Sequence, residues 1–220
     1  MIRNPFQSAD GAGRYAAGRP YLHPLFMERL GPLLSANTLG ADVACGTGLG
    51  SVALAEVVER VLAYDASAAM LAQGLHWFDR PRFFAEVRRT LKPEGVLFVY
   101  DMEFAAQLQE QPEFTDWMHQ HYGVRYPPPP RGSSSLNADE VQGAGFSFHE
   151  ERFDHWQPFT RAELVAYLLT HSNTIAASDE GRETPEEIAA WLGGKLERFL
   201  PGEAVGQLAF GGLLRMLKLV

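Results

Sequence analysis

The chain has 220 residues, of which 46% are hydrophobic and 21% charged, a composition that excludes a mainly disordered or fibrous protein. Its net charge of −8, without a strong basic cluster, disfavours nucleic acid and anionic membranes as partners. The lone Cys45 cannot form an internal disulfide and fits a reducing compartment. Neither end reads as a secretory signal or a membrane span, so we expect a cytoplasmic protein.

The first predicted elements form a βαβ unit. Residues 20–35 place leucine and phenylalanine at helical intervals, which predicts an amphipathic helix. A strand follows at 41–44, then a glycine-rich turn at 45–50, a helix from about Ser51 and a strand at 61–64. The helices alternate with strands, so we expect a parallel sheet.

A second helix and strand follow at 79–102. Phe83, Phe84, Val87 and Leu91 lie on one helical face, and the buried-looking strand covers 96–100. Between residues 103 and 135 the regular alternation of helix and strand signals is weaker, which predicts an insertion over the sheet. Beyond it we expect a strand at about 145–156, helices within 160–200 and a final strand near the end.

The turn in "DVACGTGLG" has almost no side chains, so a ligand can approach its backbone N–H groups. Asp65 ends the next strand, where a carboxylate can bind both hydroxyls of a ribose. Together they predict an adenosine nucleoside site. The alternative is that the glycines permit close strand–helix packing and that Asp65 caps a helix.

Three segments carry a family resemblance: "DVACGTG", "VLAYDASAAML" and "LHWFDRPRFFAEVRRTLKPEGVLFVYD". They resemble class I S-adenosylmethionine-dependent methyltransferases, in particular the small-molecule branch that includes trans-aconitate methyltransferase, over residues 14–102. The dinucleotide fingerprint fits less well, because Ser51 follows Gly50. The resemblance implies a single α/β domain over 1–220. It would have a Rossmann-like, doubly wound, mostly parallel sheet with helices on both faces, and a helical cap over the carboxyl-terminal strand edge from about 103–135 and 160–200.

The resemblance also implies roles for individual residues. S-adenosylmethionine would contact Asp42, Ala44, Gly46, Gly48, Asp65, Ala66 and Gln73, with Tyr15 and Arg19 closing over it. Tyr15 and Arg19 read equally well as surface residues. Ala44 stands where the family has a glycine, which is tolerable if its backbone stays extended. His76 is the candidate base, although it could instead be a satisfied histidine at a helix start.

The middle of the family pattern is missing between Asp65 and His76. Members normally place a strand, a helix and the central fourth strand there, and removing a central strand would leave unpaired backbone groups. Either a segment of the natural polymer between about Leu71 and Gly74 is omitted from this sequence, or the deletion is genuine. The intact flanks favour omission.

The reaction implied is in-line methyl transfer to a small carboxylate or hydroxyl, in which positioning supplies most of the catalysis. A hydroxyl acceptor would benefit from a base such as His76, His119 or His121. Candidate substrate residues are Trp77, Tyr122, Arg125, Tyr126, Trp156, Thr170 and Ser172. These side chains could equally form the core of the cap.

We expect no metal site, and the sequence leaves the oligomeric state open. The rival functions are a non-catalytic or degenerate nucleoside-binding module and an NAD(P)-dependent oxidoreductase. Cofactor binding without turnover would distinguish the first rival from an enzyme.

Overall fold

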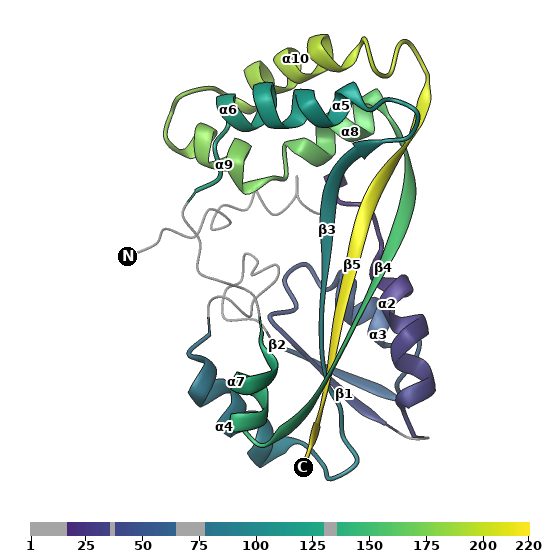
Figure 1. Cartoon of the computed structure of the whole chain (residues 1–220), viewed down its shortest axis with the longest axis vertical. Coiled ribbons are helices and arrows are strands. Elements are labelled where there is room, and N and C mark those ends of the chain that lie inside the picture. Colours follow the sequence, from purple (N-terminus) through teal and green to yellow (C-terminus); the bar gives the residue numbers. More distant parts are fainter. Residues whose placement is uncertain (1–16, 36–37, 65–77, 130–135) are drawn as a thin grey trace.

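The computed structural model describes residues 17–35, 38–64, 78–129 and 136–220, and their strands form two sheets (Figure 1). In the smaller sheet β1 (Leu39–Val43) pairs in parallel with β2 (Arg60–Tyr64). In the larger sheet three long antiparallel strands lie in the order β3-β5-β4. Their bounds are β3 (Leu97–Leu108), β4 (Phe146–Thr160) and β5 (Val205–Leu219).

Helices cover this framework in three groups. The first group comprises α2 (His23–Leu30), the short η1 (Gly31–Leu33) and α3 (Leu49–Leu54). The second comprises α4 (Arg80–Thr90) and α7 (Ala138–Gly143). The third gathers at one end of the long strands, and we call it the helical end: α5 (Glu113–Trp117), the π-helical η3 (Met118–Tyr122), α6 (Gly123–Arg125), α8 (Arg161–Leu168), α9 (Ser172–Asp179) and α10 (Pro185–Leu196) (Figure 1).

Several predicted elements are confirmed. The βαβ unit forms with its two strands parallel. The helices predicted to begin near Thr160 and Thr184 both start with a capping box, in which the threonine and the third helical residue, a glutamate, bond to each other's backbone N–H groups. The final strand is present as β5 and is longer than predicted.

The predicted insertion begins too early, because β3 continues to Leu108 instead of ending near Tyr100. Beyond Tyr100 the strand places Glu103 and other exposed residues alternately with partly buried ones, and β5 pairs with it as far as Leu108 across an irregularity after Phe104. A strand with one solvent-exposed face is stabilised largely by pairing with its neighbour. Its sequence alone is therefore easily mistaken for a loop. The short helix α7 was not predicted, whereas α9 lies within the range 160–200, for which the sequence predicts helices.

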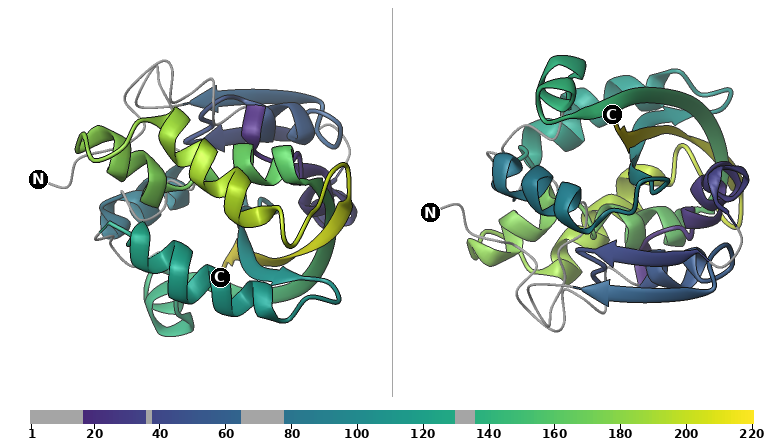
Figure 2. Two further views of the ribbon diagram at one scale, coloured as in Figure 1. Left: turned by 90° about the horizontal axis from the view of Figure 1, so that it is seen from above. Right: turned by 90° about the horizontal axis from the view of Figure 1, so that it is seen from below.

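The expected single, mostly parallel sheet is not what the described residues form. Only β1 and β2 are parallel, and no described strand joins β1 to β3. Figure 2 shows the two sheets on different sides of the molecule, with α2 between them at one side. A strand bonded to both β1 and β3 would merge the sheets. The stretch where the sequence lacks such a strand, 65–77, lies outside the described residues.

The large sheet is apolar on both faces at one end. Even-numbered residues of β3 and β5, such as Phe98, Tyr100 and Leu214, pack against α2 and α3. Odd-numbered neighbours such as Val99 and Leu217 pack against α4 and α7. Farther along, Phe104 and Phe210 of the even face join the core of the helical end. The sheet therefore holds all three helix groups in place.

One face of the small sheet remains apolar and open. Leu39, Val43, Leu62 and Tyr64 are 40–56% exposed, and the register places them on the same face together with the exposed Ala41. Parallel sheets are normally covered on both faces. Within the described residues, this face of β1 and β2 is not covered.

Replacing Leu214 by alanine tests the packing of α2 and α3 on the sheet. Leu214 is fully buried in that contact, so Leu214→Ala should reduce the free energy of unfolding by about 2–5 kcal/mol in urea denaturation. Leu213→Ala is the matched control, because the neighbouring side chain lies on the other face and is only partly buried. Equal losses for the two variants would contradict the packing described.

Candidate functional site

The glycine turn joins β1 to α3 and is bonded to the end of β2. The N–H groups of Ala44 and Cys45 both donate to the carbonyl of Tyr64, at 2.8 and 3.1 Å, and the N–H of Gly48 donates to Cys45 at 2.9 Å. Tyr64 immediately precedes the predicted ribose acid, Asp65. The turn therefore lies beside the point where the chain leaves β2.

Three residues of the turn have left-handed backbone conformations: Ala44 (φ 64°), Gly46 (φ 55°) and Gly48 (φ 82°). The expectation that Ala44 would stay extended is wrong, because the chain reverses immediately after β1 and uses this residue to do so. A side chain at φ near 60° costs about 1–2 kcal/mol relative to glycine. Among the described residues, a Cβ added to Gly48 would meet nothing within 4 Å, so they leave the turn open on that side.

Asp42, predicted to contact a cofactor, points toward α3. Its Oδ2 accepts a hydrogen bond of 2.6 Å from the Ser51 hydroxyl in the first turn of that helix. The pair fixes α3 relative to β1, so Asp42 acts on the turn through the helix that follows it. Sequence reasoning used Ser51 only as an argument against a dinucleotide.

Gly50, the third glycine of the motif, is explained by close packing. A Cβ there would lie 2.9 Å from the Tyr100 hydroxyl, 3.3 Å from Asp42 Oδ2 and 3.7 Å from His23 Nδ1. Gly50 is buried, and these three polar groups converge on it from β3, β1 and α2. For this glycine, the alternative interpretation of close strand–helix packing is the one that the structure supports.

His23 and Tyr100, neither of which was predicted from the sequence, connect α2 to β3. His23 Nδ1 and the Tyr100 hydroxyl are 2.9 Å apart, and their rings meet edge to face. Burial lowers the pKa of His23, an effect that the nearby Asp42 carboxylate partly opposes. The imidazole is therefore neutral near pH 7.

Arg19 lies under the helical end. Its guanidinium is 5.2 Å from the centre of the Tyr167 ring, and the preceding Gly18 touches α8 so closely that a Cβ would lie 2.5 Å from the Ala166 carbonyl oxygen. The predicted residues Tyr15, Asp65, Ala66, Gln73, His76 and Trp77 lie outside the described residues. Their predicted roles stay predictions.

An aromatic cluster surrounds His171 at the end of α8. The Tyr122 hydroxyl lies 3.2 Å from His171 Nδ1, and the rings of Phe104, Tyr122 and Tyr167 lie within 6.0 Å of the imidazole. Burial raises the pKa of Tyr122, so its phenol stays protonated. Sequence reasoning identified Tyr122 and missed Tyr167 and His171, which read as ordinary residues of an amphipathic helix.

Of the other predicted substrate residues, Thr170 and Ser172 flank His171, whereas Arg125 and Trp156 lie elsewhere. Thr170 is buried beside Gly18 and donates to the Tyr167 carbonyl at 2.6 Å, and Ser172 is buried at the start of α9. Arg125 binds Glu183 at 2.9 Å and lies over the Trp191 ring. Trp156 is 44% exposed on the opposite face of the sheet from Phe104, so a pocket with Tyr122 is excluded for it.

Tyr126 and the candidate histidines of the helical end also have defined places. Tyr126 is buried, and its hydroxyl donates to Glu183 at 3.0 Å. His119 and His121 are exposed on η3. In the described residues, no group of three or more histidine, cysteine, aspartate or glutamate side chains could hold a metal ion. None of the described helices is long and apolar enough to cross a membrane.

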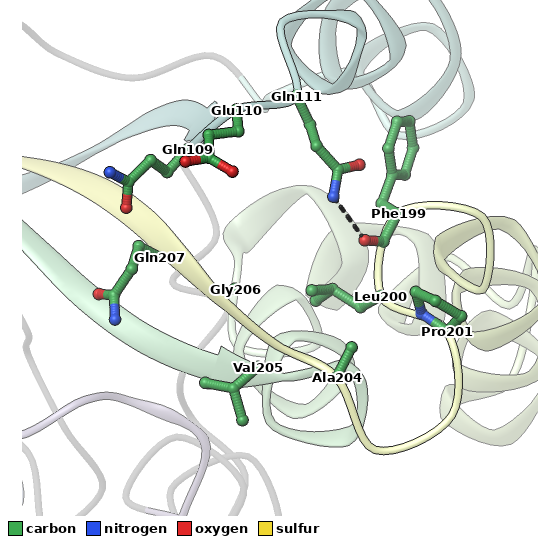
Figure 3. A pocket seen from close by; sticks show the side chains of 10 residues that line it. All are labelled: Gln109, Glu110, Gln111, Phe199, Leu200, Pro201, Ala204, Val205, Gly206 and Gln207. Atoms are coloured by element: carbon green, nitrogen blue, oxygen red, sulfur yellow. Dashed lines mark hydrogen bonds between the residues drawn. The ribbon is translucent and has the colours of Figure 1, made fainter.

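A cavity of about 380 Å³ opens at the helical end, where the loops that follow β3 and precede β5 meet (Figure 3). Gln111 Nε2 closes one side of it by donating to the Phe199 carbonyl at 2.8 Å. The cavity shares no residue with the glycine turn or the aromatic cluster. The cavity is therefore not part of the candidate functional site, in spite of its size.

Comparison with known proteins identifies the fold. No family model and no curated protein matches the chain by sequence. Among solved structures, a protein from Anaeromyxobacter dehalogenans assigned as a type II methyltransferase aligns with a TM-score of 0.61 and 20% identity, over 89% of this chain and 95% of that one.

Two further structures align at 13% identity and a TM-score of 0.50. The YcgJ protein from Bacillus subtilis aligns over 91% of this chain and 100% of its own. Phosphoethanolamine N-methyltransferase 2 from Haemonchus contortus, in complex with S-adenosyl-L-methionine, aligns over 97% of this chain and 58% of its own. The chain therefore shares the Rossmann-like α/β fold of these solved structures.

Replacing Ala44 by glycine should stabilise the protein. The substitution removes the left-handed strain of an L-residue, and the greater flexibility of glycine in the unfolded chain offsets part of the gain, leaving about 0.5–1 kcal/mol in urea denaturation. Ala189→Gly in α10 is the control, for which we expect a loss of about 1 kcal/mol. A loss of stability in Ala44→Gly would mean that the residue is not in the left-handed region.

Proposed function

We propose that this protein is an S-adenosylmethionine-dependent methyltransferase with a small-molecule acceptor. The observation that carries the proposal is the open glycine turn, held against the end of β2 by two hydrogen bonds to Tyr64. The fold shared with solved methyltransferases supports it, because in such folds ligands bind at the carboxyl ends of parallel strands.

In this proposal the cofactor lies across the carboxyl ends of β1 and β2. Gly46 and Gly48 face its methionine part, Ala44 contributes backbone, and Asp42 acts mainly through Ser51. Asp65 and Ala66 bind the ribose, Gln73 lies near the sulfonium, and Tyr15 and Arg19 close over the bound molecule. The position of Arg19 under the helical end is consistent with a residue that contacts both cofactor and acceptor.

The chemistry proposed is an in-line displacement in which a nucleophile attacks the methyl carbon while the sulfonium leaves as a neutral thioether. Because the leaving group is good, the protein needs mainly to align nucleophile, carbon and sulfur and to exclude water. His76 would accept a proton from a hydroxyl acceptor, whereas a carboxylate acceptor would need no base.

We place the acceptor between the turn and the helical end, which then acts as the substrate cap of a single domain. We propose that Tyr122, Thr170 and Ser172 belong to this region, with Trp77 at its entrance. Tyr167 and His171, which the sequence did not single out, belong to it as well. Arg19 and the polar edge of the aromatic cluster suit a small carboxylate or hydroxyl compound of the trans-aconitate type. Trp156 is left out, and Arg125 serves the structure of the helical end.

A second candidate function is a non-catalytic nucleoside-binding module. The observation that favours it is that no strand among the described residues joins β1 to β3, because a sheet without such a strand would support binding at the turn without aligning an acceptor. An NAD(P)-dependent oxidoreductase is disfavoured by Ser51 after the third glycine.

Calorimetric titration with S-adenosylhomocysteine tests the proposal, with a nicotinamide dinucleotide as the comparison ligand. We expect micromolar binding of the first ligand alone. Gly48→Ala should weaken it by at least about tenfold, because the new Cβ enters the open side of the turn at φ 82°.

Gly181→Ala is the matched control. Gly181 also has a positive φ (70°) and open space where a Cβ would be added, but it lies between α9 and α10, so the same backbone strain arises far from the turn. We expect unchanged affinity. Equal weakening in both variants, or binding of the dinucleotide alone, would overturn the proposal, and binding without methyl transfer to any acceptor would select the non-catalytic module.

A further inference from the structure

Four polar side chains meet behind the glycine turn, and two of them, His23 and Tyr100, have no role in the proposed cofactor site. The four are His23 of α2, Asp42 of β1, Ser51 of α3 and Tyr100 of β3, and we call them the support cluster. Each comes from a different element. The cluster therefore connects the small sheet, which carries the turn, to the large one.

The geometry of the support cluster is compact. Tyr100 O–H, Asp42 Oδ2 and His23 Nδ1 all lie within 3.7 Å of one point, the position that a Cβ of Gly50 would take. Two hydrogen bonds run through the cluster, one of 2.9 Å between His23 and Tyr100 and one of 2.6 Å from Ser51 to Asp42. A shift of Tyr100 would bring its hydroxyl against the backbone of Gly50, in the first turn of α3 directly after the glycine turn.

The protonation state of His23 sets which partner donates in the hydrogen bond between His23 and Tyr100. The side chain is largely removed from water, which favours its neutral form, and a neutral Nδ1 can accept the Tyr100 hydroxyl proton. A proton on Nδ1 would reverse this hydrogen bond, so that Nδ1–H donates to the Tyr100 oxygen, the Tyr100 hydroxyl has to find another acceptor, and a cation lies close to Asp42. That cation would compete with Ser51 for the carboxylate.

We propose that His23 and Tyr100 are positioning residues for the glycine turn, and that protonation of His23 displaces the turn and weakens cofactor binding. This inference rests on the proposed function, because the affected ligand is S-adenosylmethionine or its product. It adds a pH-dependent control of the same site. Neither residue is placed in contact with the cofactor.

The groups around His23 show which side chain can cause a pH dependence in the support cluster. Asp42 from β1 is the charged group that acts on the imidazole among the described residues, and Tyr100 from β3 is the titratable hydroxyl bonded to it. The Tyr21 ring lies 5.8 Å away on the same segment, and α3 contributes the uncharged Ser51. Of these groups, only His23 has a reference pKa between about 5 and 8.

The test measures the affinity of the full chain for S-adenosylhomocysteine at about pH 8 and about pH 5.5 by calorimetry. The wild-type affinity should fall at the lower pH by less than about tenfold, because the pKa of His23 in the folded protein lies below its usual value. His23→Asn places an amide oxygen where Nδ1 stands, so it keeps the acceptor for Tyr100 but cannot titrate. This variant should bind like the wild type at about pH 8 and keep most of that affinity at about pH 5.5.

Tyr100→Phe removes the hydroxyl and should bind about three- to tenfold more weakly at both pH values. Tyr126→Phe is its matched control, because Tyr126 is also buried and hydrogen-bonded but lies in the helical end, and its affinity should not change. An unchanged pH dependence in His23→Asn, or wild-type affinity in Tyr100→Phe, would overturn the positioning role alone. Absence of wild-type binding at about pH 8 would overturn the proposed function and the positioning role with it.

Thermal unfolding supplies a readout that needs no ligand. Because the pKa of His23 is lower in the folded than in the unfolded state, its contribution to stability is complete above about pH 6.5 and is lost as the pH falls below that value. The wild type should therefore lose more stability than His23→Asn over this range. Equal losses of stability in the two proteins would show that His23 is not the titrating group.

Discussion

The contact of α2 and α3 with the even face of β3 and β5 is the interaction on which the rest of the structure depends. Within the described residues the two sheets share no strand, so this apolar contact ties the glycine turn to the remainder of the molecule. Phe26 lies at its centre, with ring centres 4.5 Å from Tyr100 and 5.3 Å from Phe153. Burial of these rings supplies attraction without fixing an exact position.

The polar groups at the margin of that contact fix the position of α2 and α3 more exactly than apolar packing does. Hydrogen bonds depend on direction as well as distance, so the pairs made by His23 with Tyr100 and by Asp42 with Ser51 allow fewer arrangements than apolar packing does. Gly50 permits the approach because it has no side chain. One glycine motif thus serves two purposes, since Gly48 leaves space on the outer side and Gly50 allows contact on the inner side.

Local patterns predicted the elements well and their assembly poorly. The βαβ unit, both capping boxes and the final strand follow from spacing and cap residues that act within a few positions. The length of β3, the left-handed Ala44 and the His23–Tyr100 pair depend on partners far along the chain. No periodicity in the sequence records such pairs, because His23 and Tyr100 are brought together only when α2 packs on the large sheet.

The open apolar face of β1 and β2 affects how the protein responds to denaturants. Within the described residues, Leu39, Val43, Leu62 and Tyr64 are already 40–56% exposed in the folded state, so unfolding of this face adds less new apolar surface to water than unfolding of a covered face would. The denaturant dependence and the heat-capacity change of unfolding scale with newly exposed surface. Both quantities will therefore report more on the large sheet and its helices than on the small sheet.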